Sequence, residues 1–423
     1  MVWVSLICLV IFIFMAGSLF MKNTDVFSPA RLFIIIWSMV LGLANLKFSR
    51  YQITWTSFSW IMIIISLFSV LCGMFVVYVI NLNKPIKTII SIRSLINDGA
   101  FDSGRLFRII ILLFLAYIIS YIVTVLIIGY VPLFTKYPGV ARNDWGVFGF
   151  GLFVQSFPSI IFAVILYFLI TKGERNKKIL LFLVLAITFV TYAFLLQRYY
   201  LIFAVLLSMV AMYYLTNALR VKNTLIISLI ILILLFSVTF VRLTGAITNY
   251  LYYLSDMKYS IKYAFMTEPY MYVVMNVENL ANAIQHLDKF SYGTFSFDFI
   301  FALTGIKHQM SQYLGFVEFP NLISNNYNTY TMFFVYYRDF GILGLGLIPF
   351  ILGVVFSTAY YKMRTFPSIH TISIYAVFAF VIIFSFFVPI ITFLHFVFNL
   401  ILISYFTKAV GSKAIKHSLN PDQ

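Results

Sequence analysis

The sequence is poor in charged residues. Only 10% of its 423 residues are charged, whereas roughly 25% are charged in soluble domains. This shortage of charge and a hydrophobic share of 62% exclude a soluble globular protein. Acidic residues are especially scarce, with 13 Asp and Glu against 29 Lys and Arg. In a soluble chain this excess would suggest nucleic-acid binding. Here the basic residues flank apolar segments, so we interpret them as topology signals and expect no nucleic-acid partner.

Cysteine and the familiar motifs of soluble catalysis are also lacking. Cys8 and Cys72 lie inside apolar runs and form neither a disulfide nor a metal-ligand spacing. The chain has no phosphate-binding glycine loop, no His-Glu-x-x-His, no Gly-x-Ser-x-Gly and no paired Asp-x-Asp. We therefore expect no metal and no cofactor, and the sequence does not support a metal-dependent or nucleotide-dependent reaction.

Long hydrophobic runs dominate what is present. A helix crosses ~30 Å of hydrocarbon at ~1.5 Å per residue. Segments that reach or approach this length lie near residues 2–21, 31–46, 58–81, 106–129, 148–170, 179–196, 198–215, 224–242, 332–359, 368–384 and 386–407. The sequence therefore predicts an all-α polytopic membrane protein with about 11 transmembrane helices. Residues 179–215 as one helix would span ~55 Å, so we predict a tight hairpin at Gln197 and Arg198.

The apolar segments and the basic connections give the expected organisation. An N-terminal membrane region of about 8 helices is expected at residues 1–242, followed by a long outer loop at residues 243–331. A C-terminal membrane region of about 3 helices follows at residues 332–407, and a tail at residues 408–423. Basic residues concentrate in alternate connections, so those containing Arg93, Lys177 and Arg220 are expected in the cytoplasm together with the tail. The long loop is then periplasmic. The side of the N-terminus stays open, because residues 31–46 also fit a re-entrant segment.

The long outer loop contains a predicted amphipathic helix. Pro269 is a helix-start signal, and apolar residues recur after it at three- and four-residue spacing, at Val273, Val277, Leu280, Ile284 and Leu287. The other side of the helix carries Asn276, Asn279, Asn282 and His286. Their amides and imidazole can hydrogen-bond to sugar hydroxyls, and a solvated helix face is the alternative interpretation. A second helical stretch is expected from Thr294 to Leu303 at the membrane interface.

Ionisable residues mark the end of this loop, where it runs into the apolar segment near Met332. Arg338 and Asp339 lie at that boundary, where charges are costly unless paired or hydrated, so we interpret them as cavity residues. A self-satisfied Arg-Asp pair at a helix end is the alternative interpretation.

Arginines recur on the predicted outer face, at Arg142, Arg198, Arg242 and Arg338. Four guanidinium groups can clamp a diphosphate. Basic side chains that snorkel to the headgroup layer give the same pattern. Arg198 is the strongest candidate, because its apolar flanks leave it only a hairpin tip or a cavity.

Three stretches resemble the Wzy-type O-antigen polymerases, which join oligosaccharide repeat units in bacterial envelopes. They are Gly129-Tyr-Val-Pro-Leu-Phe followed by Arg142, then Gln197-Arg198, then Asn328-Thr-Tyr-Thr leading to Tyr337-Arg-Asp-Phe-Gly-Ile-Leu-Gly344. The topology is similar along nearly the whole length. The related O-antigen ligases have a His that is followed by Asn, Ser or Gln. Nine residues then separate this pair from a Gly-x-x-Gly or similar sequence. Tyr330 stands in place of that His, and this departure favours a polymerase.

The resemblance implies a metal-independent glycosyltransferase in the bacterial cytoplasmic (inner) membrane. Its donor would be an oligosaccharide on undecaprenyl diphosphate, transferred as a block to another lipid-linked repeat unit. Membrane lipid and a chain-length-regulating co-polymerase are the implied partners. The candidate substrate-binding residues are Arg142, Arg198, Arg242, Arg338, Asn276, Asn279 and Asn328. The candidate catalytic residues are Arg198, Tyr330, Asp339, Glu278 and His286, although tyrosine, with a reference pKa of ~10, is a poor general base.

Two other functions stay open. An O-antigen ligase, which attaches finished glycan to lipid A core, is the nearest alternative among enzymes. A lipid-linked oligosaccharide flippase or other transporter would also have many helices and buried arginines. The long outer loop and the lack of an internal repeat argue against a transporter.

Overall fold

The computed structural model of the protein describes residues 2–21, 24–97, 101–171, 174–217, 223, 245–307, 309, 313 and 319–411. Over these residues the regular elements are helical, apart from one isolated β-bridge between Ser49 and Met257. The longer helices are α1 (Val2–Gly17), α2 (Pro29–Ala44), α3 (Ser57–Ile80), α5 (Ser103–Ile128), α8 (Phe157–Ile170), α9 (Arg175–Ala193), α10 (Arg198–Leu215), α13 (Thr267–His286), α16 (Phe334–Thr365), α17 (Ile369–Phe384) and α18 (Leu394–Gly411). Shorter ones are α4 (Ile89–Asn97), α6 (Pro138–Ala141), α7 (Phe150–Val154), α12 (Gly245–Leu254) and α14 (Asp298–Thr304).

The described residues contain 8 helical segments long and apolar enough to cross a membrane, with α2 and α17 as shorter apolar helices. Over the described residues, the prediction of an all-α protein with several helices that can cross a membrane is thereby confirmed, whereas the count of about 11 transmembrane helices stays a prediction. The expected segment at residues 224–242 lies outside the described residues, as does Arg242. Each of the other expected segments contains at least one helix.

Two of the expected helices are interrupted. The segment 148–170 divides into α7 and α8, because Pro158 near the start of α8 has no N–H to continue the preceding helix. The segment 386–407 becomes helical only at Leu394, after a short 3₁₀ turn that follows Pro389. The second predicted helix of the loop is α14, which begins at Asp298 rather than near Thr294.

The chain forms two compact units. Unit 1 comprises residues 1–85, 221–361 and 381–394, and unit 2 comprises residues 86–220, 362–380 and 395–423. Each unit therefore combines stretches from both ends of the sequence. Among the described residues, the predicted outer loop contributes α12, α13 and α14 to unit 1.

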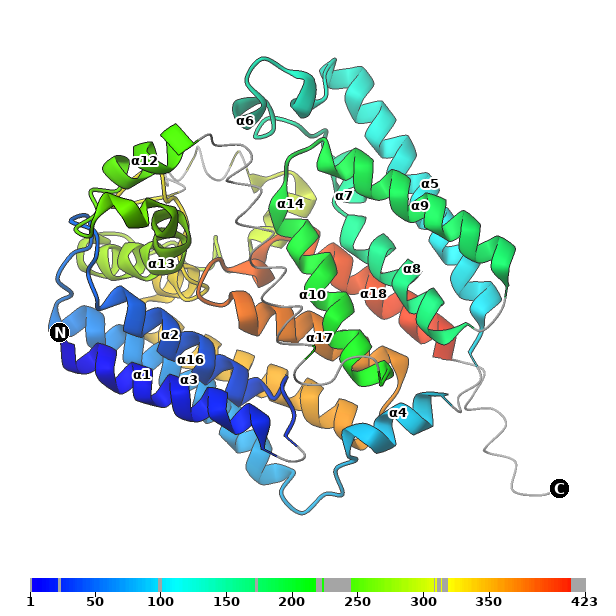
Figure 1. Ribbon diagram of the computed structural model, residues 1–423, viewed down its shortest axis with the longest axis horizontal. Coiled ribbons are helices and arrows are strands. Elements are labelled where there is room, and N and C mark those ends of the chain that lie inside the picture. Colours follow the sequence, from blue (N-terminus) through cyan, green and yellow to red (C-terminus); the bar gives the residue numbers. More distant parts are fainter. Residues whose placement is uncertain are drawn as a thin grey trace. The chain divides into compact units, whose positions relative to one another are not determined.

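In unit 1, the apolar helices α1, α2, α3 and α16 lie side by side (Figure 1). The Ser5 hydroxyl donates to the Gly42 carbonyl oxygen over 2.9 Å, so α1 and α2 run antiparallel. Gly73 of α3 and Gly353 of α16 form the crossing point, where a Cβ on Gly73 would lie 2.1 Å from the Phe350 carbonyl oxygen. Membrane helices approach this closely only through small residues.

In unit 2, α8 packs against α5, α9 and α10 (Figure 1). Helix α18 joins them through the fully buried Asn399, whose amide donates to the Gln155 carbonyl oxygen over 2.8 Å. The Ser159 hydroxyl donates back to the Asn399 side chain over 2.5 Å. Polar side chains within membrane segments commonly find a partner on a neighbouring helix in this way.

Candidate functional site

The turn between α9 and α10 is the hairpin that the sequence predicted. Helix α9 ends at Ala193, α10 begins at Arg198, and Gln197 is the residue that flanks α10. Leu196 has a φ of 57°, a left-handed conformation that reverses the chain within a few residues. Arg198 therefore lies on the first turn of a membrane-length helix, and its side chain is half-buried.

The stretch that follows α5 packs onto this same turn. Gly129 ends α5 with a φ of 81°, a conformation that glycine adopts without a steric penalty. The Leu133 backbone N–H then donates to the Phe194 carbonyl oxygen over 3.1 Å. The guanidinium Nη1 of Arg142 donates to the Leu196 carbonyl oxygen over 3.3 Å. Two of the three stretches that carry the family resemblance thus meet in unit 2, and they bring Arg142 and Arg198 to one turn.

A network of amides and a phenol supports the turn from the inside. The Gln155 amide donates to the Gln197 side-chain oxygen over 2.9 Å. The Tyr192 hydroxyl lies 3.0 Å from that oxygen and 3.1 Å from the side-chain oxygen of Gln155. The sequence analysis did not identify Gln155 or Tyr192 as candidates. Gln155 could have been found, because a polar amide inside an apolar segment marks either a partner helix or a cavity.

An apolar groove of about 260 Å³ leads along α5 and α9 to this region. It is lined by Tyr121, Ile122, Val125, Leu126, Val131, Phe134, Thr191 and Phe194. Phe194, one of the lining residues, lies two residues before the carbonyl group that binds Arg142, and its ring packs on Phe134 with centroids 5.2 Å apart. The lining of a hydrophobic groove therefore includes a residue of the turn that precedes Arg198.

The third stretch of the resemblance lies in unit 1, where it builds an aromatic and cationic stack. The rings of Tyr330 and Phe334 are stacked, with centroids 3.8 Å apart. The Arg338 guanidinium carbon lies 3.5 Å from the centre of the Phe295 ring and 5.8 Å from that of Phe334. Arg338 is only 3% exposed. It is held as a cation over aromatic faces, an arrangement that stabilises a buried guanidinium.

Tyr330 is placed as a hydrogen-bond donor. Its hydroxyl donates to the Pro320 carbonyl oxygen, and burial raises the pKa of the phenol above its usual value. A phenol with a raised pKa does not accept a proton at neutral pH.

Asp339 is fully buried and serves as an acceptor for the segment before α14. Its carboxylate accepts hydrogen bonds from the Ser291 hydroxyl and from the backbone N–H groups of Phe295 and Ser296, at 3.3 Å and 2.5 Å for the two N–H groups. The carboxylate thereby positions Phe295, the ring that lies over Arg338. Arg338 and Asp339 are thus both built into the packing around residues 291–296.

The glycines after Asp339 have a steric explanation. Helix α16 kinks at Gly341, which has a φ of 60°. The kink brings the Tyr336 carbonyl oxygen so close to Gly344 that a Cβ there would lie 2.0 Å from it. A side chain at Gly341 would also meet the Phe290 ring at 3.0 Å. The Gly-Ile-Leu-Gly sequence therefore permits a sharp change of helix direction.

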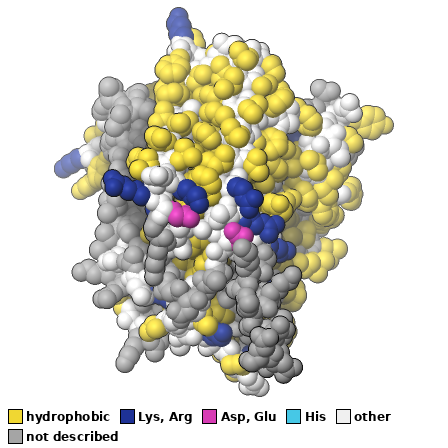
Figure 2. Space-filling view, turned by 90° about the vertical axis from the view of Figure 1, so that its right-hand side faces the viewer, with side chains coloured by type: hydrophobic (Ala, Val, Ile, Leu, Met, Phe, Trp, Pro, Cys, Tyr) yellow, Lys and Arg dark blue, Asp and Glu magenta, His cyan; other side chains and the backbone are white. Residues whose placement is uncertain are grey.

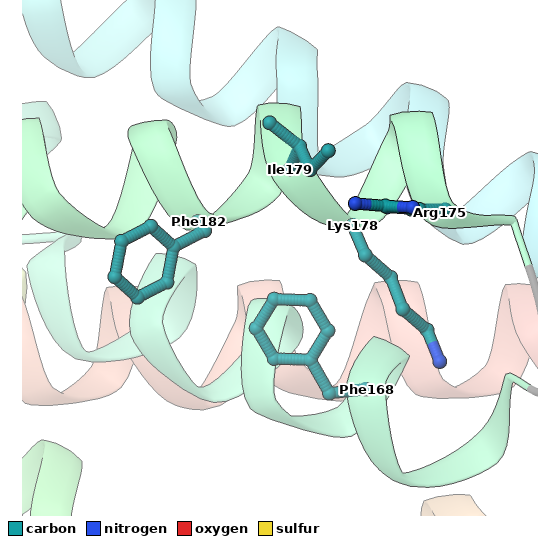
Figure 3. A pocket seen from close by; sticks show the side chains of 5 residues that line it. All are labelled: Phe168, Arg175, Lys178, Ile179 and Phe182. Atoms are coloured by element: carbon teal, nitrogen blue, oxygen red, sulfur yellow. The ribbon is translucent and has the colours of Figure 1, made fainter.

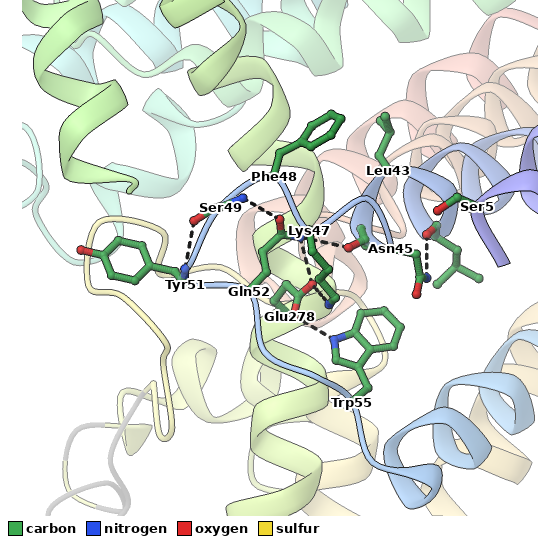
Figure 4. A network of polar contacts seen from close by, with 12 residues as sticks. Ser5, Leu43, Asn45, Lys47, Phe48, Ser49, Tyr51, Gln52, Trp55 and Glu278 are labelled. Atoms are coloured by element: carbon green, nitrogen blue, oxygen red, sulfur yellow. Dashed lines mark hydrogen bonds and ion pairs between the residues drawn. The ribbon is translucent and has the colours of Figure 1, made fainter. Parts of the chain in front are cut away.

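Glu278 lies at the centre of a buried polar network in unit 1 (Figure 4). It forms an ion pair with Lys47. Its two carboxylate oxygens also accept hydrogen bonds from the Gln52 amide at 3.0 Å and the Trp55 indole at 2.8 Å. Burial raises the pKa of Glu278, and the nearby Lys47 opposes this effect. Burial likewise lowers the pKa of Lys47. The network ties α13 to the connection between α2 and α3.

Asn276 and Asn279 of α13 are buried and Asn282 is half-buried, so the alternative interpretation as a solvated face is wrong for these asparagines. Asn279 donates to the carbonyl oxygens of Tyr327 and Thr329 over 2.7 Å and 2.9 Å. Asn276 accepts a hydrogen bond from the Thr329 hydroxyl, and Asn282 donates to the Asn321 carbonyl oxygen over 2.8 Å. The periodicity of the sequence separated this face from the apolar one but did not reveal that residues 321–329 cover it.

His286 and Asn328 differ from these buried candidates because both are exposed. His286 lies at the end of α13, with ring Nδ1 2.9 Å from the Asn282 carbonyl oxygen. Asn328 lies on the segment that α13 holds in place. Both side chains can therefore contact a ligand from solution.

Comparison with known proteins adds no further assignment. No family model, no curated protein and no solved structure matches the chain.

Proposed function

We propose that the protein is a polymerase that joins undecaprenyl-diphosphate-linked oligosaccharide repeat units on the outer face of the bacterial cytoplasmic membrane. The observation that supports this most directly is in unit 2, where Arg142 and Arg198 meet at a turn beside an apolar groove. A groove of apolar side chains matches an isoprenoid tail. Guanidinium groups next to it match a diphosphate, which they can bind through paired hydrogen bonds.

The proposed reaction is a displacement at the anomeric carbon of the donor glycan. A sugar hydroxyl of the acceptor repeat unit forms the new glycosidic bond, the bond from the anomeric carbon to the diphosphate oxygen breaks, and the lipid diphosphate leaves with the bonding electron pair. The hydroxyl proton passes to a base or to solvent. Charge develops on the leaving diphosphate, so arginines that already face it lower the barrier without reorganising.

The amide network keeps the arginines in position. Gln197 is held by Gln155 and Tyr192, so the first turn of α10 starts from a fixed point. The Arg142 hydrogen bond to Leu196 fixes the other side of the turn. A site whose groups are already oriented does not spend binding energy on ordering them.

A chromosomal deletion tests the class of function in cells that make O-antigen. A polymerase predicts that lipid A core then carries a single repeat unit. Loss of all repeat units from the core would indicate a ligase instead. Accumulation of lipid-linked units on the inner leaflet would indicate a transporter.

A further inference from the structure

A second groove lies in unit 2, between α8 and α9, at the end of these helices where α8 stops and α9 starts (Figure 3). The turn that holds Arg198 is at the opposite end of α9. The groove has a volume of about 660 Å³ and is lined by Phe168, Arg175, Lys178, Ile179 and Phe182. It therefore consists of three apolar side chains with two cationic ones.

The apolar part of the groove faces outward. Ile179 is 52% exposed and Phe182 is 62% exposed, although both belong to a helix of membrane-spanning length and composition. Exposed apolar side chains on such a helix are in contact with lipid rather than water. An acyl chain is the ligand that this part of the groove fits.

The cationic part lies at one end of the groove. The Lys178 ammonium donates to the Thr171 carbonyl oxygen over 2.7 Å, which keeps it at the end of α8. Arg175 is exposed and makes no hydrogen bond or ion pair with any residue that the structure describes. The neighbouring carboxylate, Glu174, forms an ion pair with Lys177 at 3.1 Å and accepts from Tyr167, so it is already engaged.

Charged side chains also gather on the surface of the protein. Figure 2 shows a face whose upper part is largely hydrophobic, with Lys and Arg side chains and a few acidic ones below it. Basic residues gather where membrane helices reach the lipid headgroups.

We propose that the groove between α8 and α9 binds an anionic phospholipid. Its acyl chain lies along Phe168, Ile179 and Phe182, and its phosphate contacts Arg175 and Lys178. A zwitterionic lipid would place its own ammonium group near the same two cations, so the site selects lipids with a net negative charge. Basic pockets between membrane helices are recognised sites for anionic headgroups. This inference is independent of the proposed polymerase activity.

Binding of defined lipids to the purified full-length protein tests the site. The protein in detergent is titrated with phosphatidylglycerol or phosphatidylcholine, and bound lipid is counted by native mass spectrometry. We expect tighter retention of phosphatidylglycerol. Near a membrane surface, each basic residue contributes about fivefold to the affinity for an anionic lipid. We therefore expect the double variant Arg175→Gln with Lys178→Gln to bind phosphatidylglycerol roughly 25-fold more weakly. Lys84→Gln removes an exposed charge at the end of α3 and leaves binding unchanged.

A variant that keeps both charges separates this groove from charge alone. Ile179→Trp places a large ring in the groove, and we expect it to weaken phosphatidylglycerol binding as well. Equal retention of the two lipids by the wild type would overturn the proposal. Wild-type binding by Ile179→Trp would also overturn it, because the headgroup would then bind without the groove. If the double variant is not recovered in a folded form, the phosphatidylglycerol binding of Ile179→Trp, compared with that of Lys84→Gln, still tests the proposal.

Discussion

The guanidinium of Arg142 donates a hydrogen bond to the carbonyl oxygen of Leu196, two residues before Arg198. This contact joins the segment after α5 to the turn between α9 and α10. In the sequence, more than one membrane-length helix separates that segment from that turn. The same guanidinium has further N–H groups that this contact does not use, and in the proposed donor site they would bind the diphosphate.

Substitution of Arg142 tests whether the residue belongs to the proposed site. We expect Arg142→Ala to reduce polymer formation by roughly 30-fold or more, the effect of losing a charge-assisted contact of ~2 kcal/mol in a transition state. Arg142→Lys keeps one donor but not the planar fork, so partial activity is expected. Polymer ladders normalised to protein abundance give the measurement. Full activity of Arg142→Ala at normal abundance would exclude the residue from the site.

The Lys47 and Glu278 pair predicts strong non-additivity in stability. Lys47→Met leaves a buried carboxylate without its cation, and we expect it to destabilise the protein by about 3–5 kcal/mol. The double variant Lys47→Met with Glu278→Gln removes both charges and should be much closer to the wild type. Unfolding of the purified proteins in detergent, as a double-mutant cycle, gives the coupling. Additive effects of the two substitutions would show that the pair contributes no coupling.

The raised pKa of Glu278 predicts that the stability of the protein depends on pH. Because burial raises the pKa in the folded protein, the folded state binds a proton more readily than the unfolded chain, whose glutamates have a pKa of about 4.3. The stability that this provides is fully present below the unfolded value and is lost as pH rises through the folded value. Wild-type stability relative to Glu278→Gln should therefore increase as pH falls from 8 toward 4.5. A constant difference between their melting temperatures over that range would contradict the expectation.

The glycines of α16 provide a matched pair of alanine substitutions. A Cβ at Gly344 would lie 2.0 Å from the Tyr336 carbonyl oxygen, whereas a Cβ at Gly346 meets nothing within 4 Å. We expect Gly344→Ala to lower protein abundance and melting temperature, because backbone must move to admit the methyl group. Gly346→Ala should be neutral or stabilising by up to about 1 kcal/mol, from its better helix propensity. Similar behaviour of the two variants would mean that the kink at Gly341 does not constrain Gly344.

The sequence predicted the parts of the fold that follow from local chemistry. Apolar runs of membrane length gave the helices, and the excess length of residues 179–215 gave the turn at Gln197 because one helix that long would overshoot the bilayer. The pairing of Lys47 with Glu278 could not be predicted, since nothing in the local sequence of either residue identifies a partner 231 positions away. The same holds for the asparagines of α13. Their spacing placed them on one face, but only the tertiary structure shows which segment covers that face.

Arg198 provides the most direct test of the account, because its position at the start of α10 between two apolar helices is the feature on which the proposed donor site depends. We expect Arg198→Ala to lose long-chain glycan, with a rate roughly 30- to 1000-fold lower if a contact of ~2–4 kcal/mol is lost, while protein level and membrane insertion persist. Arg198→Lys should retain part of the activity. Arg50→Ala, which removes an exposed arginine that pairs with Asp256 in unit 1, serves as the control and should make normal polymer. The measurement is the chain-length profile on a gel, normalised to protein abundance. Loss of polymer from Arg198→Ala alone supports the account, and wild-type polymer from Arg198→Ala contradicts it.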